Sequence, residues 1–105
     1  RRDVPEVEQF YALGRAIERN ELDALIVIGG LNAYLAVHSM ISERDRYPAF
    51  RIPIVLVPAS IDNNLPGSEL SIGADTAINN ATWALDRIKE SAAATKRCFV
   101  AEIMG

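Results

Sequence analysis

The sequence predicts an α/β fold in which an open parallel sheet is flanked by helices. Two short aliphatic runs, at residues 24–28 and 54–57, lack alternating polar residues, as is typical of strands covered on both faces. Segments with apolar residues at helical spacing lie before, between and after these runs. Gly29-Gly30 ends the first run and Pro58 ends the second. Helices and strands therefore alternate along the chain, which favours parallel strands with helical connections.

Two helices are expected in the first half of the chain. The first, from Pro5 to Arg19, has its apolar positions at Val7, Phe10, Leu13 and Ile17. The second follows Gly30, and its apolar side is formed by Ala33, Val37, Met40 and Ile41. The charged, proline-containing stretch from Glu43 to Pro53 is predicted to be a surface loop.

The second half is predicted to contain a long loop, a helix and a third strand. Residues Ala59 to Gly73 are rich in turn-forming residues, and a loop of this length is usually functional. A helix is expected from Asp75 to Ala94, with a buried side formed by Ala77, Ala81, Ala84, Leu85 and Ile88. Residues 98–104 are interpreted as a strand in which Cys98 is a buried thiol.

Composition limits the classes of function. The chain has 105 residues, of which 50% are hydrophobic and 24% charged, so a single globular domain or part of one is expected. The net charge of -3 favours neither nucleic acid nor an anionic membrane as a partner. No run has the roughly 18 apolar residues of a membrane span. The single cysteine indicates a reducing, cytoplasmic location, and the missing initiator Met suggests a segment of a longer chain.

In open α/β sheets, ligands bind beyond the carboxyl ends of the strands. Three segments of this sequence are expected there: residues 29–33, residues 59–68, and Met104-Gly105. Any function carried by this chain is therefore predicted to reside in these three segments.

Ser60-Ile61-Asp62-Asn63-Asn64 is the segment richest in chemistry. A hydroxyl, a carboxylate and two amides at a strand end can bind a polyhydroxy ligand through several hydrogen bonds. Asp62 can also act as a general base that takes the proton from an attacking hydroxyl. An Asx-turn or helix-capping cluster explains the same residues without any ligand, and both interpretations stay open.

Gly29-Gly30 allows close approach of the backbone to a ligand and precedes a helix, whose N-terminal amides favour anions. The segment lacks the spacing of a dinucleotide fingerprint and the Gly-Lys-Ser/Thr of a P-loop. Leu31-Asn32-Ala33 adds no carboxylate for Mg²⁺, so weak binding of Mg-nucleotide and no metal ligand are predicted. A tight strand-to-helix turn without a ligand is the alternative.

Taken together, residues 22–105 resemble the phosphofructokinase family. The resemblance is carried by Ile28-Gly29-Gly30, by residues 58–64 and 66–68, by residues 71–77, and by Glu102-Ile103-Met104-Gly105. It implies that residues 1–105 are a fragment of one incomplete, Rossmann-like domain of phosphofructokinase type. It also implies a glycolytic kinase that transfers a phosphoryl group from ATP, or from pyrophosphate, to the 1-hydroxyl of fructose 6-phosphate.

The resemblance also implies roles for single residues. Asp62 corresponds to the catalytic base, Ser60 is expected beside the sugar 1-hydroxyl and the transferred phosphate, and Asn63 and Asn64 are expected to support the loop. The implied substrate-binding set is Ser60, Ile61, Asp62, Asn63, Asn64, Met104 and Gly105. Gly29 and Gly30 correspond to a degenerate nucleotide loop, because catalytic members have Gly-Gly-Asp-Gly-Ser where this chain has Gly-Gly-Leu-Asn-Ala.

This departure resembles the carboxyl-terminal half of long, two-half phosphofructokinases. In that half the sugar site often binds the effector fructose 2,6-bisphosphate, so a non-catalytic regulatory role is the alternative, although Asp62 is kept here. The parent enzyme is expected to need Mg²⁺ and ATP, neither of which should bind strongly to this fragment. The expected partners are a sugar phosphate, the rest of the parent chain and further copies in a homo-oligomer. An α/β fragment that binds no ligand by itself is a third possibility.

Overall fold

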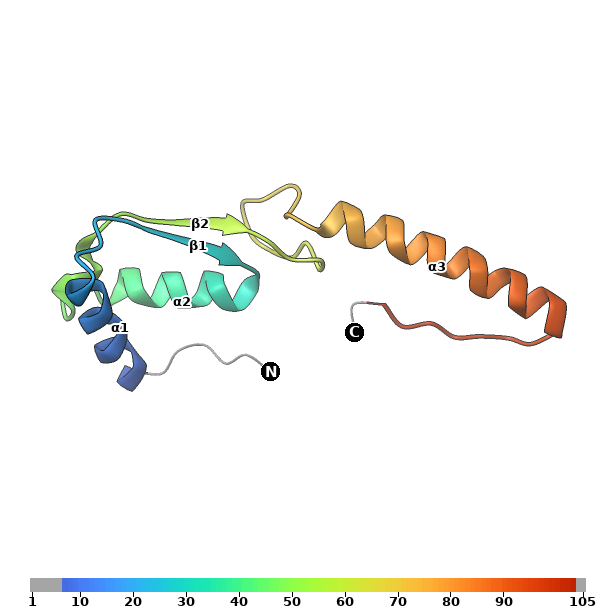
Figure 1. Cartoon of the computed structure of the whole chain (residues 1–105), viewed down its shortest axis with the longest axis horizontal. Helices are drawn as coiled ribbons and strands as arrows, with labels where there is room; N and C mark the ends of the chain where they lie inside the picture. The colour runs from blue at the N-terminus through green and yellow to red at the C-terminus, as the bar shows by residue number, and fades with distance from the viewer. Residues whose placement is uncertain (1–6, 104–105) are drawn as a thin grey trace.

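The computed structural model describes residues 7–103, and its elements follow the predicted order (Figure 1). These elements are the helices and strands α1 (Val7–Arg19), β1 (Leu25–Gly29), α2 (Leu31–Ser42), the short 3-10 helix η1 (Pro48–Arg51), β2 (Ile54–Pro58) and α3 (Ala74–Thr95). The three predicted helices and the first two strands are confirmed. Pro5, the expected start of the first helix, lies outside the described residues.

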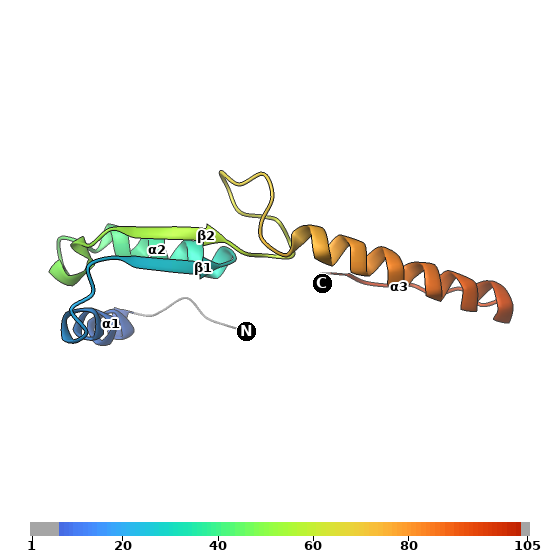
Figure 2. The ribbon, with the colours of Figure 1, turned by 45° about the horizontal axis from the view of Figure 1, so that its top comes forward.

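The two strands form a parallel pair in which Leu25 lies opposite Ile54 and Gly29 opposite Pro58. Helix α2 connects the strands and covers one face of the pair (Figure 2). On the other face Ile26 and Ile28 are each 67% exposed. The expectation of strands covered on both faces is therefore wrong for this structure, since no element within residues 7–103 packs against that second face.

The core lies where α1, α2 and η1 meet the beginning of the sheet. Its buried residues are Phe10, Ile17, Met40 and Phe50. The rings of Phe10 and Phe50 pack edge to face, with centroids 5.8 Å apart and planes at 82°. Such pairs add to the stability that comes from burying apolar area. The core thereby anchors α1, which in sequence precedes the sheet.

The stretch from Glu43 to Pro53 is not simply the surface loop that its charges predicted. Pro48 begins η1, and this turn directs Phe50 inward until its side chain is 0% exposed. The Arg44 guanidinium stabilises this turn, because its Nε donates a hydrogen bond to the Phe50 carbonyl at 3.1 Å. The segment is rich in charged residues, but burial of the Phe50 ring determines how it folds.

Helix α3 leads away from the sheet, and the chain extends over 63 × 24 × 23 Å (Figure 1). Its one buried residue is Ala74. The predicted buried side is wrong in this structure: Ala77 and Ala81 are only half-buried, while Leu85 and Ile88 are 40% and 37% exposed. An apolar stripe is buried only when another surface packs on it, and no described element does so here.

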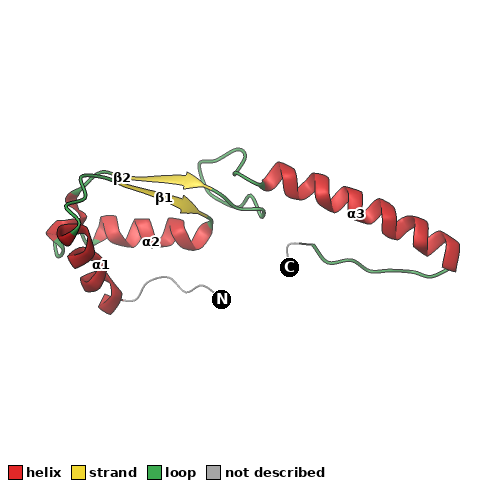
Figure 3. Ribbon diagram, viewed as in Figure 1, coloured by secondary structure: helices red, strands yellow, loops and turns green. Residues whose placement is uncertain are grey.

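The predicted third strand is also wrong for the residues that the structure describes. Residues 97–103 are drawn as loop in Figure 3 and are not paired with β1 or β2. Cys98, expected to be a buried thiol, is exposed, as is Val100. A strand requires a hydrogen-bonding neighbour, and α3 carries this segment away from the sheet.

Two glycines offer a matched test of packing near β1 and α1. A Cβ on Gly29 would lie 2.6 Å from the Ala33 Cβ, whereas one on Gly14 would lie 3.6 Å from its nearest neighbour, the Ala49 Cβ. We expect Gly29→Ala to lower the free energy of unfolding by about 1–3 kcal/mol through overpacking. Gly14→Ala, inside a helix, should raise it by about 0.5–1 kcal/mol. Urea unfolding followed by circular dichroism measures both, and a neutral Gly29→Ala would contradict the close approach.

Candidate functional site

The site lies at the carboxyl edge of the sheet, where β1 and β2 end side by side. The Ala59 N–H donates a hydrogen bond to the Gly29 carbonyl at 2.9 Å, so the two strand ends are joined directly. Beyond them, β1 turns into α2 at Gly30, and β2 continues into the loop of residues 59–73 (Figure 3). The parallel register thus places both predicted binding segments at one edge.

Gly30 lets the two segments approach each other closely. A Cβ built on Gly30 would lie 3.4 Å from the Ser60 Cβ and 3.5 Å from the Ser60 Oγ. A side chain at position 30 would therefore stand directly against the Ser60 hydroxyl. The glycine pair serves a tight strand-to-helix turn, as its ligand-free interpretation proposed, and it also keeps the space before Ser60 open.

That space is a hollow of about 460 Å³. It is lined by residues of both strand ends, namely Ile28, Gly29, Gly30, Leu31, Asn32, Ala33, Ser60, Asp62 and Asn64. The structure therefore brings together the predicted glycine pair and three of the predicted sugar-binding residues. Asp62 supplies the one carboxylate of this lining, beside a hydroxyl and two amides, a set suited to hydrogen bonding a hydroxylated ligand.

The beginning of the loop is held by a hydrogen bond between residues two positions apart. The Asp62 N–H donates to the Ser60 Oγ at 3.2 Å, an arrangement typical of a serine turn. Asp62 and Asn64 remain exposed. The turn interpretation and the binding interpretation are thus compatible, because the Ser60 hydroxyl shapes the backbone while the Asp62 side chain lines the hollow.

The predicted substrate-binding set is divided by the structure. Asn63 does not line the hollow: its amide is hydrogen-bonded to the far side of the loop, at Glu69 and Ser71. Ile61 also lies outside the lining and is 51% exposed. Met104 and Gly105 lie outside the described residues. Ser60, Asp62 and Asn64 are the members that meet at the hollow.

The lining also includes residues to which the sequence analysis assigned no binding role of their own, although residues 31–33 belong to the predicted ligand-binding segment 29–33. Ile28 and the first turn of α2, residues 31–33, border the hollow because they flank the glycine pair. Ser71 was missed as well: it is 3% exposed, and its backbone N–H is a partner of Asn63. Adjacency to Gly29-Gly30 was the available signal for the first group, and Ser71 lies in the 71–77 motif of the family resemblance, although no role was assigned to it.

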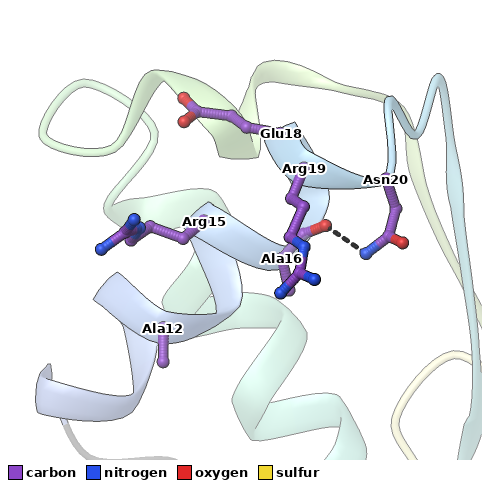
Figure 4. A pocket seen from close by; sticks show the side chains of 6 residues that line it. All are labelled: Ala12, Arg15, Ala16, Glu18, Arg19 and Asn20. Atoms are coloured by element: carbon purple, nitrogen blue, oxygen red, sulfur yellow. Dashed lines mark hydrogen bonds between the residues drawn. The ribbon is translucent and has the colours of Figure 1, made fainter.

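A larger hollow of about 740 Å³ lies along α1 and does not have the character of a binding site. Its lining comes from one helix and the residue that follows, namely Ala12, Arg15, Ala16, Glu18, Arg19 and Asn20 (Figure 4). The charged side chains in Figure 4 point in different directions. The Asn20 Nδ2 donates to the Ala16 carbonyl at 2.7 Å, which completes the helix end. Among the described residues, the lining of this hollow comes from α1 and Asn20 alone, so no second element of the lining opposes these groups across it.

The described chain offers little for a metal ion. Within residues 7–103, no three His, Cys, Asp or Glu side chains gather as a metal site would require. The glycine turn, residues 29–33, carries no carboxylate, the protein ligand that Mg²⁺ prefers, and the one carboxylate that lines the hollow is that of Asp62. In the same range, no helix combines the length and the apolar character needed to cross a membrane.

The comparison with known families decides the relationship. The phosphofructokinase family model matches residues 1–105. The chain belongs to the phosphofructokinase family. Among curated relatives, the platelet-type ATP-dependent 6-phosphofructokinase of Mus musculus is 46% identical over 89% of this chain, and the ATP-dependent 6-phosphofructokinase of Dictyostelium discoideum is 41% identical over 99%.

Solved structures agree with this assignment. The phosphofructokinase of Saccharomyces cerevisiae is 42% identical, and its superposition covers 79% of this chain with a TM-score of 0.76. The T-state phosphofructokinase of Pichia pastoris gives the same TM-score over 82% of the chain. This phosphofructokinase segment spans 12% and 13% of the length of the mouse and Dictyostelium relatives. The predicted family and the Rossmann-like α/β class are thus confirmed.

Proposed function

We propose that this chain is part of one domain of an ATP-dependent 6-phosphofructokinase and supplies the loop that binds the sugar phosphate. The observation that carries the proposal is the meeting of Ser60, Asp62 and Asn64 at one hollow beside the glycine turn. In the proposed reaction, the 1-hydroxyl of fructose 6-phosphate attacks the terminal phosphorus of the donor. The Asp62 carboxylate takes the hydroxyl proton, the bond to the leaving group breaks, and fructose 1,6-bisphosphate and ADP result.

The glycine turn takes no Mg-nucleotide of its own in this proposal. Gly30 is followed by Leu31, Asn32 and Ala33, of which only Asn32 has a polar side chain. The one carboxylate that lines the hollow beside this turn is that of Asp62. The donor and its Mg²⁺ are accordingly held by other parts of the whole enzyme. Relatives named as beta subunits in Kluyveromyces lactis and Saccharomyces cerevisiae support an assembly of several chains, and the role in glycolysis supports a cytoplasmic location.

The second candidate is a regulatory site for fructose 2,6-bisphosphate. The missing carboxylate at residues 31–33 favours it, because the same sugar-binding loop can hold an effector without a donor beside it. Both candidates use Ser60, Asp62 and Asn64 to bind a sugar phosphate, and they differ in whether the Asp62 carboxylate accepts a proton during turnover.

Hydrogen exchange tests which ligand this segment binds. In a full-length phosphofructokinase that carries this sequence, fructose 6-phosphate or fructose 2,6-bisphosphate should slow amide exchange in residues 59–73. Mg-ATP should leave exchange at residues 29–33 unchanged. Protection of residues 29–33 by Mg-ATP would contradict the degenerate nucleotide turn. Unchanged exchange of the loop with both sugar phosphates would contradict the sugar site itself.

A further inference from the structure

The Asn63 side chain connects two distant points of its own loop. Its Nδ2 donates a hydrogen bond to the Glu69 carbonyl at 3.1 Å, and its Oδ1 accepts one from the Ser71 N–H at 2.8 Å. Both polar ends of the amide are therefore engaged within the protein. The Asn63 side chain thus spans its own loop, whereas its sequence neighbours Asp62 and Asn64 line the hollow.

The loop that Asn63 crosses is already closed at its base. Ala59 and Ile72 form an isolated parallel bridge, and the Ile72 N–H donates to the Pro58 carbonyl at 3.0 Å. Leu65 lies between these ends and is only 5% exposed. The loop is thus a compact closed unit, and the two side-chain hydrogen bonds of Asn63 join its first part to its last part.

The backbone at Asn63 makes this arrangement specific. Its φ is 49°, in the left-handed region that asparagine tolerates better than most residues. Asn63 directly follows Asp62 in the chain. On its other side the Asp62 N–H is held by the Ser60 Oγ. The peptide that carries the Asp62 carboxylate is therefore restrained by a hydrogen bond before it and by the Asn63 amide after it.

We propose that Asn63 is a positioning residue of the phosphofructokinase reaction: its amide braces the loop of residues 59–72 so that the Asp62 carboxylate faces the hollow. This inference rests on the proposed role of Asp62 as the base. Asn63 makes no contact with the sugar phosphate in this arrangement. It acts through Asp62, for which small errors of position are costly, because misplacement by about 1 Å can lower a rate by about 10²-fold.

The decisive variant is Asn63→Gly in a full-length phosphofructokinase that carries this sequence. Glycine adopts a φ of 49° without strain, so this variant removes both side-chain hydrogen bonds and leaves the turn allowed. We expect kcat to fall by about 10- to 100-fold, with a much smaller change in KM for fructose 6-phosphate. Amide exchange in residues 69–72 should rise, while exchange in β1 and β2 stays as in the parent.

Two further variants separate the brace from other roles. Asn63→Asp keeps an oxygen that accepts from the Ser71 N–H but loses the donor to the Glu69 carbonyl, so an intermediate kcat is expected. Asn80→Ala removes an exposed amide from α3 and should change neither kcat nor loop exchange. A kcat of Asn63→Asp that is higher than that of Asn63→Gly supports a bracing role for the Oδ1 atom. If Asn63 served only to allow the positive φ, Asn63→Gly would keep the full kcat.

Several outcomes would overturn the inference. Unchanged exchange in residues 69–72 of Asn63→Gly would show that the amide does not brace the loop. A raised KM with unaltered loop exchange would place Asn63 in contact with the substrate instead. If amide exchange in β1 and β2 of Asn63→Gly were also faster, Asn63 would contribute to the stability of the whole fold and not specifically to the loop. If Asp62→Asn retains full turnover, the proposed function fails, and loop exchange in Asn63→Gly still decides the brace independently of turnover.

Discussion

Replacing Asp62 with asparagine is expected to lower the kcat of a full-length phosphofructokinase carrying this sequence by about 10²- to 10⁴-fold, the range of general-base catalysis. Asparagine has nearly the same shape as aspartate, so the hollow and the bond between the residue 62 N–H and the Ser60 Oγ should persist. The amide accepts no proton from the sugar hydroxyl at neutral pH. The loss should therefore appear in kcat, measured as the rate of fructose 1,6-bisphosphate formation.

The control for this variant is Asp86→Asn on the exposed surface of α3. It makes the same chemical change away from the hollow and should leave kcat unchanged. Preserved turnover in Asp62→Asn, combined with an altered response to fructose 2,6-bisphosphate, would contradict a catalytic role. That result would identify the loop as the regulatory site that is the second candidate function.

Phe50→Ala is expected to lower the free energy of unfolding by about 3–5 kcal/mol, as large-to-small changes at buried aromatic residues do. Phe50 is 0% exposed and packs against both Phe10 and Tyr47, with ring centroids 5.8 Å and 5.4 Å away. Alanine would leave a cavity where α1 and η1 meet. Because a typical domain is stable by only about 5–15 kcal/mol, this single change should bring the chain close to unfolding.

Urea unfolding of the 105-residue chain, followed by far-ultraviolet circular dichroism, measures the effect. Tyr11→Ala serves as control, since it removes an aromatic ring of the same class that is 61% exposed on α1. Its effect should stay within about 0.5 kcal/mol. Equal effects of the two substitutions would contradict the central place of Phe50 in the core.

Much of the fold could be predicted because strong local signals coincide with it. Uninterrupted aliphatic runs mark β1 and β2, Gly29-Gly30 and Pro58 mark their ends, and the spacing of Val37 and Met40 marks the buried side of α2. The strand-end rule then predicted that Gly30 and Ser60 belong to one site, and the two are neighbours in the structure.

The site was predicted less completely, because neighbouring side chains of one segment contact different parts of the structure. Asn63 and Asn64 are chemically identical, and both were placed in the substrate-binding set and expected to support the loop, with no distinction between them. The positive φ at Asn63 and its bonds to Glu69 and Ser71 turn the first amide into the loop, whereas Asn64 borders the hollow. Such a division depends on contacts between residues six and eight positions apart, which composition does not encode.

The sequence by itself determined the α/β class, the positions of β1 and β2 to within one residue and the place of α2 between them, and the phosphofructokinase motifs at the strand ends. These properties follow from local periodicity and from residues that start or stop an element. Only the tertiary structure decided that Phe50 is buried from within a charged stretch and that Leu85, Ile88 and residues 98–103 are unpacked. Burial and strand pairing each need a second segment that packs on, or hydrogen-bonds to, the first. The pattern within one segment describes that segment alone.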